Sequence, residues 1–237
     1  SQRQAKKRTV QGELEKALRA LGWEGRSILL SGRTDTGVHA SGQVAAVDFE
    51  WSHPDSEFVR ALNAKLPMDV SIWTARKVRD DFHPRFDAVS RTYRYRLFYQ
   101  PTRDPLRERF VWRVPVTLNG KTLEKAARLF IGTHDFHAFG SPTTPKGTTV
   151  RTVKRCTWMQ TAPDEWQFEV QADAFLYRMV RRMVFIQTAV AQGKVSAEAV
   201  AESLVKQAGA GKRSGLPSGL APAHGLTLDE VRYQEST

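Results

Sequence analysis

The strongest structural signal in this chain of 237 residues is an alternation of side-chain character within residues 91–99. The odd positions put apolar and aromatic side chains on one face: Tyr93, Tyr95, Leu97 and Tyr99. The even positions put polar and charged side chains on the other: Thr92, Arg94 and Arg96. Side chains of a β-strand alternate with a period of two, so the segment predicts a half-buried strand.

Helices and strands are expected to alternate on both sides of this strand. The expected helices cover residues 9–21, 56–66, 122–131, 175–186 and 196–207. Thr9 is the expected cap of the first helix and Ser56 that of the second, and the third is expected to end at Gly132. The expected strands lie at residues 27–30, 43–49, 150–160 and 166–170. Residues 101–105 begin and end with proline and separate two halves, 1–100 and 106–237, and residues 209–219 predict a loop. This order predicts an α+β fold with helices on one face of a largely antiparallel sheet.

Charge points to a polyanionic partner. Lysine and arginine number 36 against 25 acidic residues, a net charge of +11. Such an excess favours nucleic acid because each neutralised phosphate releases counterions, although a merely soluble basic protein is the alternative. The single cysteine, Cys156, excludes an internal disulfide and is typical of a reducing cytoplasm. No apolar run is long enough for a membrane span.

A loop between two glycines, Gly32 and Gly37, is the best candidate for chemistry. It follows an apolar strand and holds Arg33 and Asp35 two positions apart. The arginine would keep the carboxylate ionised, and an ionised carboxylate can act as a nucleophile. The alternative is a turn in which Asp35 caps its own backbone, and the loop alone favours that turn.

Residues 32–40 read Gly-Arg-Thr-Asp-Thr-Gly-Val-His-Ala. This segment is similar to the active-site signature of the tRNA pseudouridine synthase A family, Gly-Arg-Thr-Asp-x-Gly-Val-His-Ala, and the whole chain resembles that family. Five more segments follow in the family's order: residues 63–70, 81–88 with 91–95, 132–136, 175–181 and 221–226. Six segments in order carry the resemblance far better than any one of them.

The resemblance implies roles for individual residues. Asp35 matches the nucleophile, and Arg33 matches the arginine that helps to flip the target base. Tyr93 matches a tyrosine that packs on the uracil and is a candidate to handle its C5 proton, and Arg181 matches the basic partner of the aspartate. The remaining candidate substrate-binding residues in the matched segments are Thr34, His39 and Arg91.

The resemblance also implies the wider picture. Two ferredoxin-like, RRM-like halves would share an extended sheet, with the active-site cleft between them. The expected activity is the isomerisation of uridine to pseudouridine at tRNA positions 38, 39 and 40, without a cofactor or metal, in a cytoplasmic homodimer. The family opens with an apolar strand, and only the tail of that segment is matched by residues 1–4, so we expect the first strand to be missing.

Two departures concern residues after Arg181. Arg182 and Phe185 stand where the family commonly has asparagine and glycine. The bulk of Phe185 implies either looser helix packing or a compensating small residue opposite. At an earlier position, Thr36 replaces a common alanine, which a loop should tolerate.

Other functions stay open from the residues alone. A non-catalytic RNA-binding module would use the same basic surface and aromatic strand without needing the Arg-Thr-Asp loop. A phosphate-handling enzyme could use Arg33 and His39, but the chain lacks a phosphate-binding loop. His134 and His137 have a spacing that a metal site allows, yet no further ligand cluster accompanies them, so no metal is expected.

Overall fold

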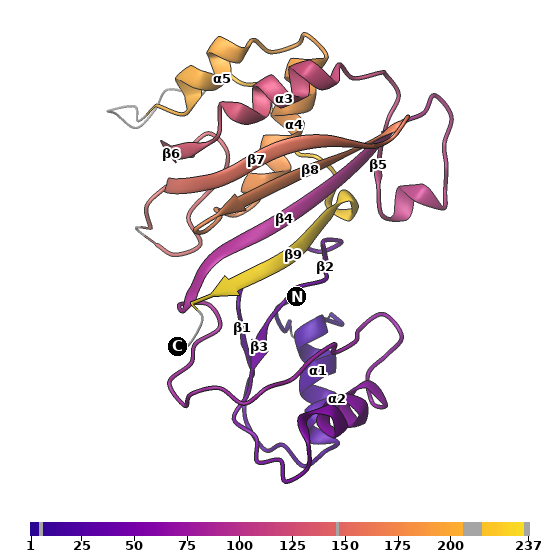
Figure 1. Ribbon diagram of the computed structural model, residues 1–237, viewed down its shortest axis with the longest axis vertical. Coiled ribbons are helices and arrows are strands. Elements are labelled where there is room, and N and C mark those ends of the chain that lie inside the picture. The colour runs from indigo at the N-terminus through magenta and orange to yellow at the C-terminus, as the bar shows by residue number, and fades with distance from the viewer. Residues whose placement is uncertain (5–6, 146, 206–214, 235–237) are drawn as a thin grey trace. The chain divides into compact units, whose positions relative to one another are not determined.

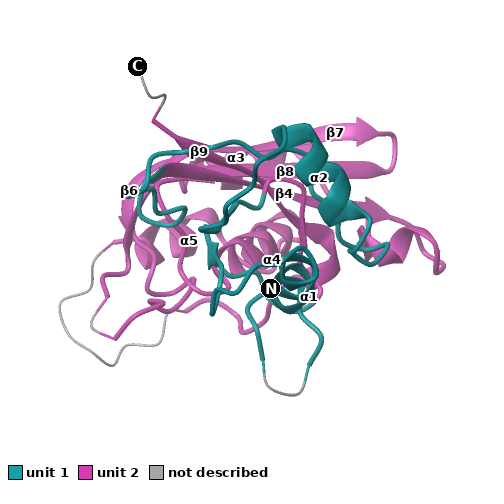
Figure 2. Ribbon diagram, turned by 90° about the horizontal axis from the view of Figure 1, so that it is seen from below, with its two compact units in different colours: residues 1–36, 43–88 teal, residues 37–42, 89–237 magenta. Residues whose placement is uncertain are grey.

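The computed structural model describes residues 1–4, 7–145, 147–205 and 215–234. They form two compact units (Figure 2). Unit 1 comprises residues 1–36 and 43–88, and unit 2 comprises residues 37–42 and 89–237. Most of the expected loop at residues 209–219 lies outside the described residues, which resume at residue 215.

Unit 1 contains two helices and a short antiparallel strand pair: α1 (Val10–Arg19), β1 (Leu29–Leu30), β3 (Ala45–Ala46) and α2 (Asp55–Asn63). The prediction for α1 is confirmed, including its cap, because the Thr9 side chain accepts a hydrogen bond from the backbone N–H of Gly12. Its apolar face enters the small core of the unit, formed by Leu14, Ala17, Leu18, Trp23, Ile28 and Leu62.

The expected cap of α2 is wrong. The helix begins at Asp55, Pro54 occupies the cap position, and no side chain caps it. The pyrrolidine ring fixes the backbone of Pro54 near the helical φ, so the chain can enter the helix before Ser56. The helix ends at Asn63, whose side chain donates to the carbonyl of Ile72 and accepts from its N–H, both at 2.7 Å.

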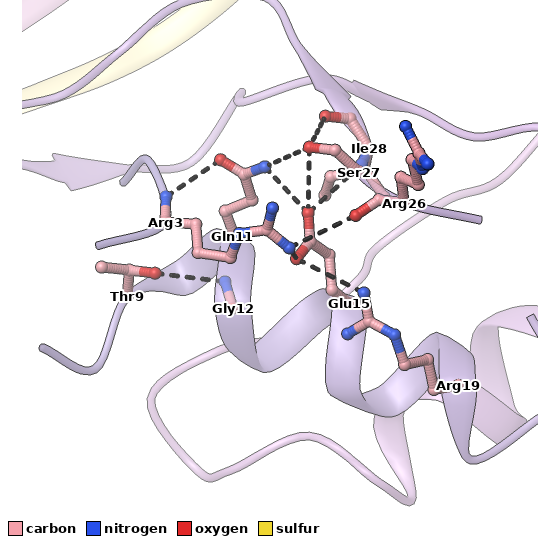
Figure 3. Close-up of polar contacts among 9 residues, drawn as sticks. All are labelled: Arg3, Thr9, Gln11, Gly12, Glu15, Arg19, Arg26, Ser27 and Ile28. Carbon is pink, nitrogen blue, oxygen red and sulfur yellow. Dashed lines mark hydrogen bonds and ion pairs between the residues drawn. The ribbon is translucent and has the colours of Figure 1, made fainter. Parts of the chain in front are cut away.

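A buried carboxylate organises the inner face of α1 (Figure 3). The Glu15 side chain is 1% exposed and accepts hydrogen bonds from Arg3 at 2.9 Å, Gln11 at 2.9 Å, the Ser27 hydroxyl at 3.2 Å and the N–H of Ile28 at 3.3 Å. Burial alone would raise the pKa of Glu15, but these donors outweigh it and the pKa is lowered. The glutamate therefore holds the first residues and β1 on the helix.

Unit 2 is built on a seven-stranded sheet. Its strands are β2 (His39–Ala40), β4 (Ala88–Tyr99), β5 (Trp112–Val114), β6 (Gly132–Asp135), β7 (Val150–Ala162), β8 (Glu165–Ala172) and β9 (Leu226–Tyr233). The order is β2-β9-β4-β8-β7-β6, with β5 paired to β4. The run β4-β8-β7-β6 is antiparallel, whereas β2 with β9 and β5 with β4 are parallel, so the sheet is mixed.

Strand β4 confirms the strand predicted from the sequence, but its alternation holds only in part, because Thr92 and Phe98 on the even face are also buried, at 2% and 0% exposed. Tyr95 and Leu97 are 0% exposed and face the core, opposite Phe168 and Trp166 of β8, whereas Arg96 is exposed. Burying one such side chain contributes about 1.5–3 kcal/mol. The strand therefore anchors the largest core of the protein.

Three helices gather on one face of this sheet (Figure 1): α3 (Gly120–Arg128), α4 (Met179–Ala191) and α5 (Ala197–Ser203). Helix α3 packs on α4 and on β7, and Trp158 of β7 donates its indole N–H to Gln187 of α4 at 2.8 Å. Short 3-10 turns, η1 (Arg107–Arg109) and η2 (Ala223–Gly225), precede β5 and β9. Among the described residues, no helix has the length and hydropathy that crossing a membrane requires.

Several expected boundaries of these helices are wrong. Helix α3 is capped by Asn119 and ends at Arg128. Gly132, which has a φ of 112°, is the first residue of β6 and does not cap the helix. Helix α4 begins at Met179, so Phe175 lies outside it. The reason is Arg178, whose left-handed backbone (φ 64°) interrupts the helical run of apolar residues. Helix α5, expected at residues 196–207, runs from Ala197 to Ser203, and Ser196 is its cap, since its hydroxyl accepts from the N–H of Ala199.

Phe185 is accommodated by a glycine. A Cβ on Gly219 would lie 2.4 Å from Cζ of the Phe185 ring, far inside van der Waals contact. Gly219 also has a φ of 142°, which side chains rarely adopt. Of the two expectations for Phe185, the compensating small residue is therefore the one that the structure contains.

Candidate active site

The candidate nucleophile lies in a loop whose first half is fixed within unit 1. At the base of the loop, the N–H of Ser31 donates to the carbonyl of Val44, and the side chain of Gln43 accepts from the Ser31 hydroxyl and donates to the carbonyl of Gly32. The backbone N–H and C=O of Thr34 both bond to Ser1, at 3.0 and 2.9 Å. The N–H and the carbonyl of Thr34, the residue before Asp35, are thus both fixed by hydrogen bonds.

The side chains of this segment differ in exposure. Arg33 is exposed, whereas Thr34 and Asp35 are half-buried. An exposed guanidinium next to a half-buried carboxylate suits the expected division of labour, in which one group contacts RNA and the other reacts.

The second half of the loop belongs to unit 2. Gly37 has a φ of 81°, and a Cβ there would lie 3.4 Å from the methyl group of Ala223. Strand β2 then pairs in parallel with β9, with His39 opposite Thr227. The Ser41 hydroxyl donates to Asp229 at 3.0 Å, which fixes the exit of the loop.

His39 is half-buried in unit 2. Its ring packs against Phe110 at 5.1 Å between centroids, and its Nε2 is buried without a hydrogen-bond partner in the described part of the chain. A second histidine, His224, lies close by: burial lowers its pKa, and the neighbouring His39 lowers it further. The matched segment 221–226 contained His224, but sequence reasoning gave it no role.

Tyr93 stands on β4 with its ring half-buried. The ring of Phe175 meets it edge to face, at 5.0 Å between centroids and 85° between planes. Two residues earlier, Arg91 donates from Nη1 to the carbonyl of Asp173 at 2.9 Å. Both side chains therefore come from the end of β4 that lies beside the β8–α4 connection.

Arg181 is held in the first turn of α4. Its Nε donates to the carbonyl of Ala221 at 2.8 Å, and the N–H of Ala221 donates back to the carbonyl of Arg181 at 3.2 Å. The side chain is half-buried, as its place between apolar neighbours predicted. Arg182, beside it, donates to the carbonyl of Gly219 at 3.0 Å, so both arginines donate to backbone carbonyls of residues 219–221.

The candidates fall into two groups. Arg33, Thr34 and Asp35 belong to unit 1, whereas His39, Arg91, Tyr93 and Arg181 belong to unit 2. The expected pairing of Asp35 with Arg181 stays a prediction, because it joins the two units. Within the described residues, no group of three or more histidine, cysteine or acidic side chains is placed to hold a metal ion.

Comparison with known proteins decides the family. A sequence model described as tRNA pseudouridine synthase matches residues 1–87 and 126–234. Proteins named tRNA pseudouridine synthase A are similar over nearly the whole chain. The one from Chloroflexus aurantiacus is 41% identical over 98% of this chain and 83% of its own length, and that from Roseiflexus castenholzii is 42% identical over 99% and 86%. The chain belongs to the tRNA pseudouridine synthase family.

The similarity extends to a third lineage and covers most candidates. The tRNA pseudouridine synthase A 1 of Bacillus cereus is 40% identical over 95% of this chain and 90% of its own length. The residues matched by the family model include Asp35, His39 and Arg181, whereas Arg91 and Tyr93 lie between its two matched ranges. Tyr93 therefore stays a candidate that rests on the resemblance of residues 91–95, with which its position on the strand agrees.

Proposed function

We propose that this protein converts uridine to pseudouridine in tRNA and that Asp35 is its nucleophile. Membership of the tRNA pseudouridine synthase family, established over almost the whole chain, is the observation that carries the proposal. The excess of 36 basic over 25 acidic residues suits an RNA substrate. The target is proposed to be the anticodon stem-loop, at positions 38, 39 and 40.

The reaction is an isomerisation that needs no net co-reactant. The bond between ribose C1′ and uracil N1 breaks, the detached uracil turns, and C1′ bonds to C5 instead. The C5 proton is lost to a base and N1 regains a proton, so atoms balance. Asp35 can assist by attacking either C1′ or uracil C6, and each route returns the carboxylate at the end.

The other candidates take roles that their chemistry supports. Arg33 is exposed and can contact RNA where the target base leaves the stack. Tyr93 offers an aromatic face to the uracil and a hydroxyl for the C5 proton. Arg181 is the proposed partner of the Asp35 carboxylate, and Thr34, His39 and Arg91 are proposed to line the substrate site.

The wider architecture belongs to the same proposal. We infer two ferredoxin-like halves with the substrate cleft between them, in a cytoplasmic homodimer. The halves expected at residues 1–100 and 106–237 differ from the compact units, because residues 37–42 and 89–100 belong to unit 2. The support is the family membership together with the α+β content of both units. Release of tritium from tRNA labelled at uridine C5 reports directly on the reaction.

The decisive variant is Asp35→Asn, which keeps the shape of the side chain but removes its charge. We expect tritium release to fall by at least about 10³-fold, a loss typical of removing a nucleophile, while tRNA still binds. The matched control is Asp80→Asn, an exposed aspartate of the same unit, which should react at the wild-type rate. Retained turnover in Asp35→Asn would remove Asp35 as nucleophile, and tRNA binding without turnover in the wild type would favour a non-catalytic RNA-binding module.

A further inference from the structure

A single segment joins several parts of the unit 2 site. We call residues 219–225, between α5 and β9, the strap. Arg182 donates to the carbonyl of Gly219 and Arg181 to that of Ala221. The strap thus receives two neighbouring side chains of α4 on its backbone. Its last residues form η2 and lead into β9, the partner of the strand that carries His39.

A third side chain reaches the strap from β4. The hydroxyl of Tyr95 donates to the carbonyl of Pro222 at 2.8 Å, across 127 positions of sequence. Tyr95 is 0% exposed, and its ring leaves no room above it: a Cβ on Gly225 would lie 2.7 Å from its Cζ. The hydroxyl of Tyr95 therefore holds Pro222, and its ring packs closely on Gly225, so together they fix the distance between the strap and the sheet.

The hydroxyl is a permanent donor. Burial raises the pKa of Tyr95 well above its ordinary value, and the guanidinium of Arg181 is near enough to oppose that rise. The phenol stays protonated throughout the physiological range. The Pro222 carbonyl consequently has an uncharged donor throughout that range.

Two of the three side-chain acceptors described on the strap are consecutive carbonyls. Ala221 accepts from Nε of Arg181 and Pro222 accepts from Tyr95. The N–H of Ala221 also donates to the carbonyl of Arg181, so the arginine is tied to this residue through its backbone and its side chain. A shift of the Pro222 carbonyl would therefore rotate or displace the group that orients the guanidinium.

We propose that Tyr95 is a positioning residue for the isomerisation, acting through the strap to orient Arg181. The inference rests on the proposed function, in which Arg181 serves the reacting carboxylate. Misplacing a catalytic group by about 1 Å can cost on the order of 100-fold in rate. A positioning residue should therefore affect the chemical step and leave tRNA affinity almost unchanged.

The test is Tyr95→Phe, which removes only the hydroxyl. We expect kcat for tritium release to fall about 10- to 100-fold, while KM for tRNA stays within about twofold. Tyr99→Phe is the matched control, because Tyr99 lies on the same face of the same strand and packs on the same core, away from the strap contacts described above. It should keep the wild-type kcat.

A second measurement separates positioning from general destabilisation. If Tyr95 works through Arg181, adding Tyr95→Phe to Arg181→Lys should cost far less in kcat than it costs alone. Three outcomes would overturn the inference. The losses in kcat of the two single variants could be additive, or Tyr95→Phe could keep the wild-type kcat. The loss in kcat of Tyr95→Phe could also equal the fraction of protein that circular dichroism shows to be unfolded. Absence of turnover in the wild type would instead overturn the proposed function itself.

Discussion

Glu15 of unit 1 is a buried residue whose pKa is lowered by its hydrogen-bond donors. An ionised carboxylate inside a protein is costly unless donors replace its water. Here Arg3, Gln11, Ser27 and the backbone of Ile28 supply those donors from three segments of unit 1 (Figure 3). Since the core of this unit is small, the network is a large part of what orders its beginning.

The stability of unit 1 should accordingly depend on pH through Glu15. Its pKa is lowered in the folded protein, so its contribution is present above the ordinary carboxyl pKa of about 4.3 and is lost as pH falls through the folded value. We expect Glu15→Gln to lower the free energy of unfolding by about 1.5–3 kcal/mol at neutral pH. Urea unfolding of both proteins at a series of pH values measures this.

The control for this experiment is Glu24→Gln, which changes an exposed glutamate of the same unit. It should leave the free energy of unfolding within about 0.5 kcal/mol of the wild type. The difference in the free energy of unfolding between wild type and Glu15→Gln should become smaller as the pH falls into the acid range. A difference that stays constant with pH would show that the charge of Glu15 contributes nothing.

At the scale of elements, local patterns predicted what local forces determine. Strand β4 forms where the alternating pattern predicted it, and helix α1 begins after its expected cap, Thr9, where a side-chain oxygen can reach a free N–H. The boundaries that failed depend on backbone geometry. Arg178 adopts a left-handed conformation in the middle of an apolar run, and nothing in its residue type announces this.

The candidate site shows the same limit. The resemblance of short, contiguous segments made Arg33, Asp35, Tyr93 and Arg181 candidates, and their common site stays a prediction. The partner of the Tyr95 hydroxyl lies 127 positions away, so the strand pattern could assign this tyrosine only to the core. Contacts between distant segments, such as the parallel pairing of β2 with β9, follow from the fold rather than from local spacing.

The packing of α4 against the strap gives a prediction at this scale. Gly219→Ala places a methyl group into the Phe185 ring and onto a backbone with positive φ, so the free energy of unfolding should fall by about 1–3 kcal/mol or more. Thermal and urea unfolding report this loss. Gly215→Ala is the matched control, because a Cβ at Gly215 meets no atom within 4 Å.

A double variant identifies the clash. Phe185→Ala shortens the opposing side chain, and Gly219→Ala should cost less in that background than in the wild type. Equal costs in both backgrounds would mean that the backbone conformation of Gly219, and not the ring of Phe185, accounts for the destabilisation.

At the scale of the whole molecule, charge is the dominant property. Several acidic side chains of unit 2 pair with arginines, as in the ion pairs of Asp229 with Arg94, Glu165 with Arg96 and Glu169 with Arg155. With a net charge of +11, the remaining basic groups outnumber any internal partners. A polyanion such as tRNA can satisfy them where a neutral ligand cannot.

Binding of tRNA should therefore weaken steeply with salt. If six or more phosphates are contacted, affinity should fall by about 10³-fold or more between about 50 and 200 mM salt, with the logarithm of Kd linear in that of the salt concentration. Asp35→Asn is the protein to use, because filter binding then reports affinity without turnover. A matched titration with a neutral nucleoside should be flat. If the tRNA curve were equally flat, the basic surface would not be an RNA-binding surface, and the excess charge would need another partner.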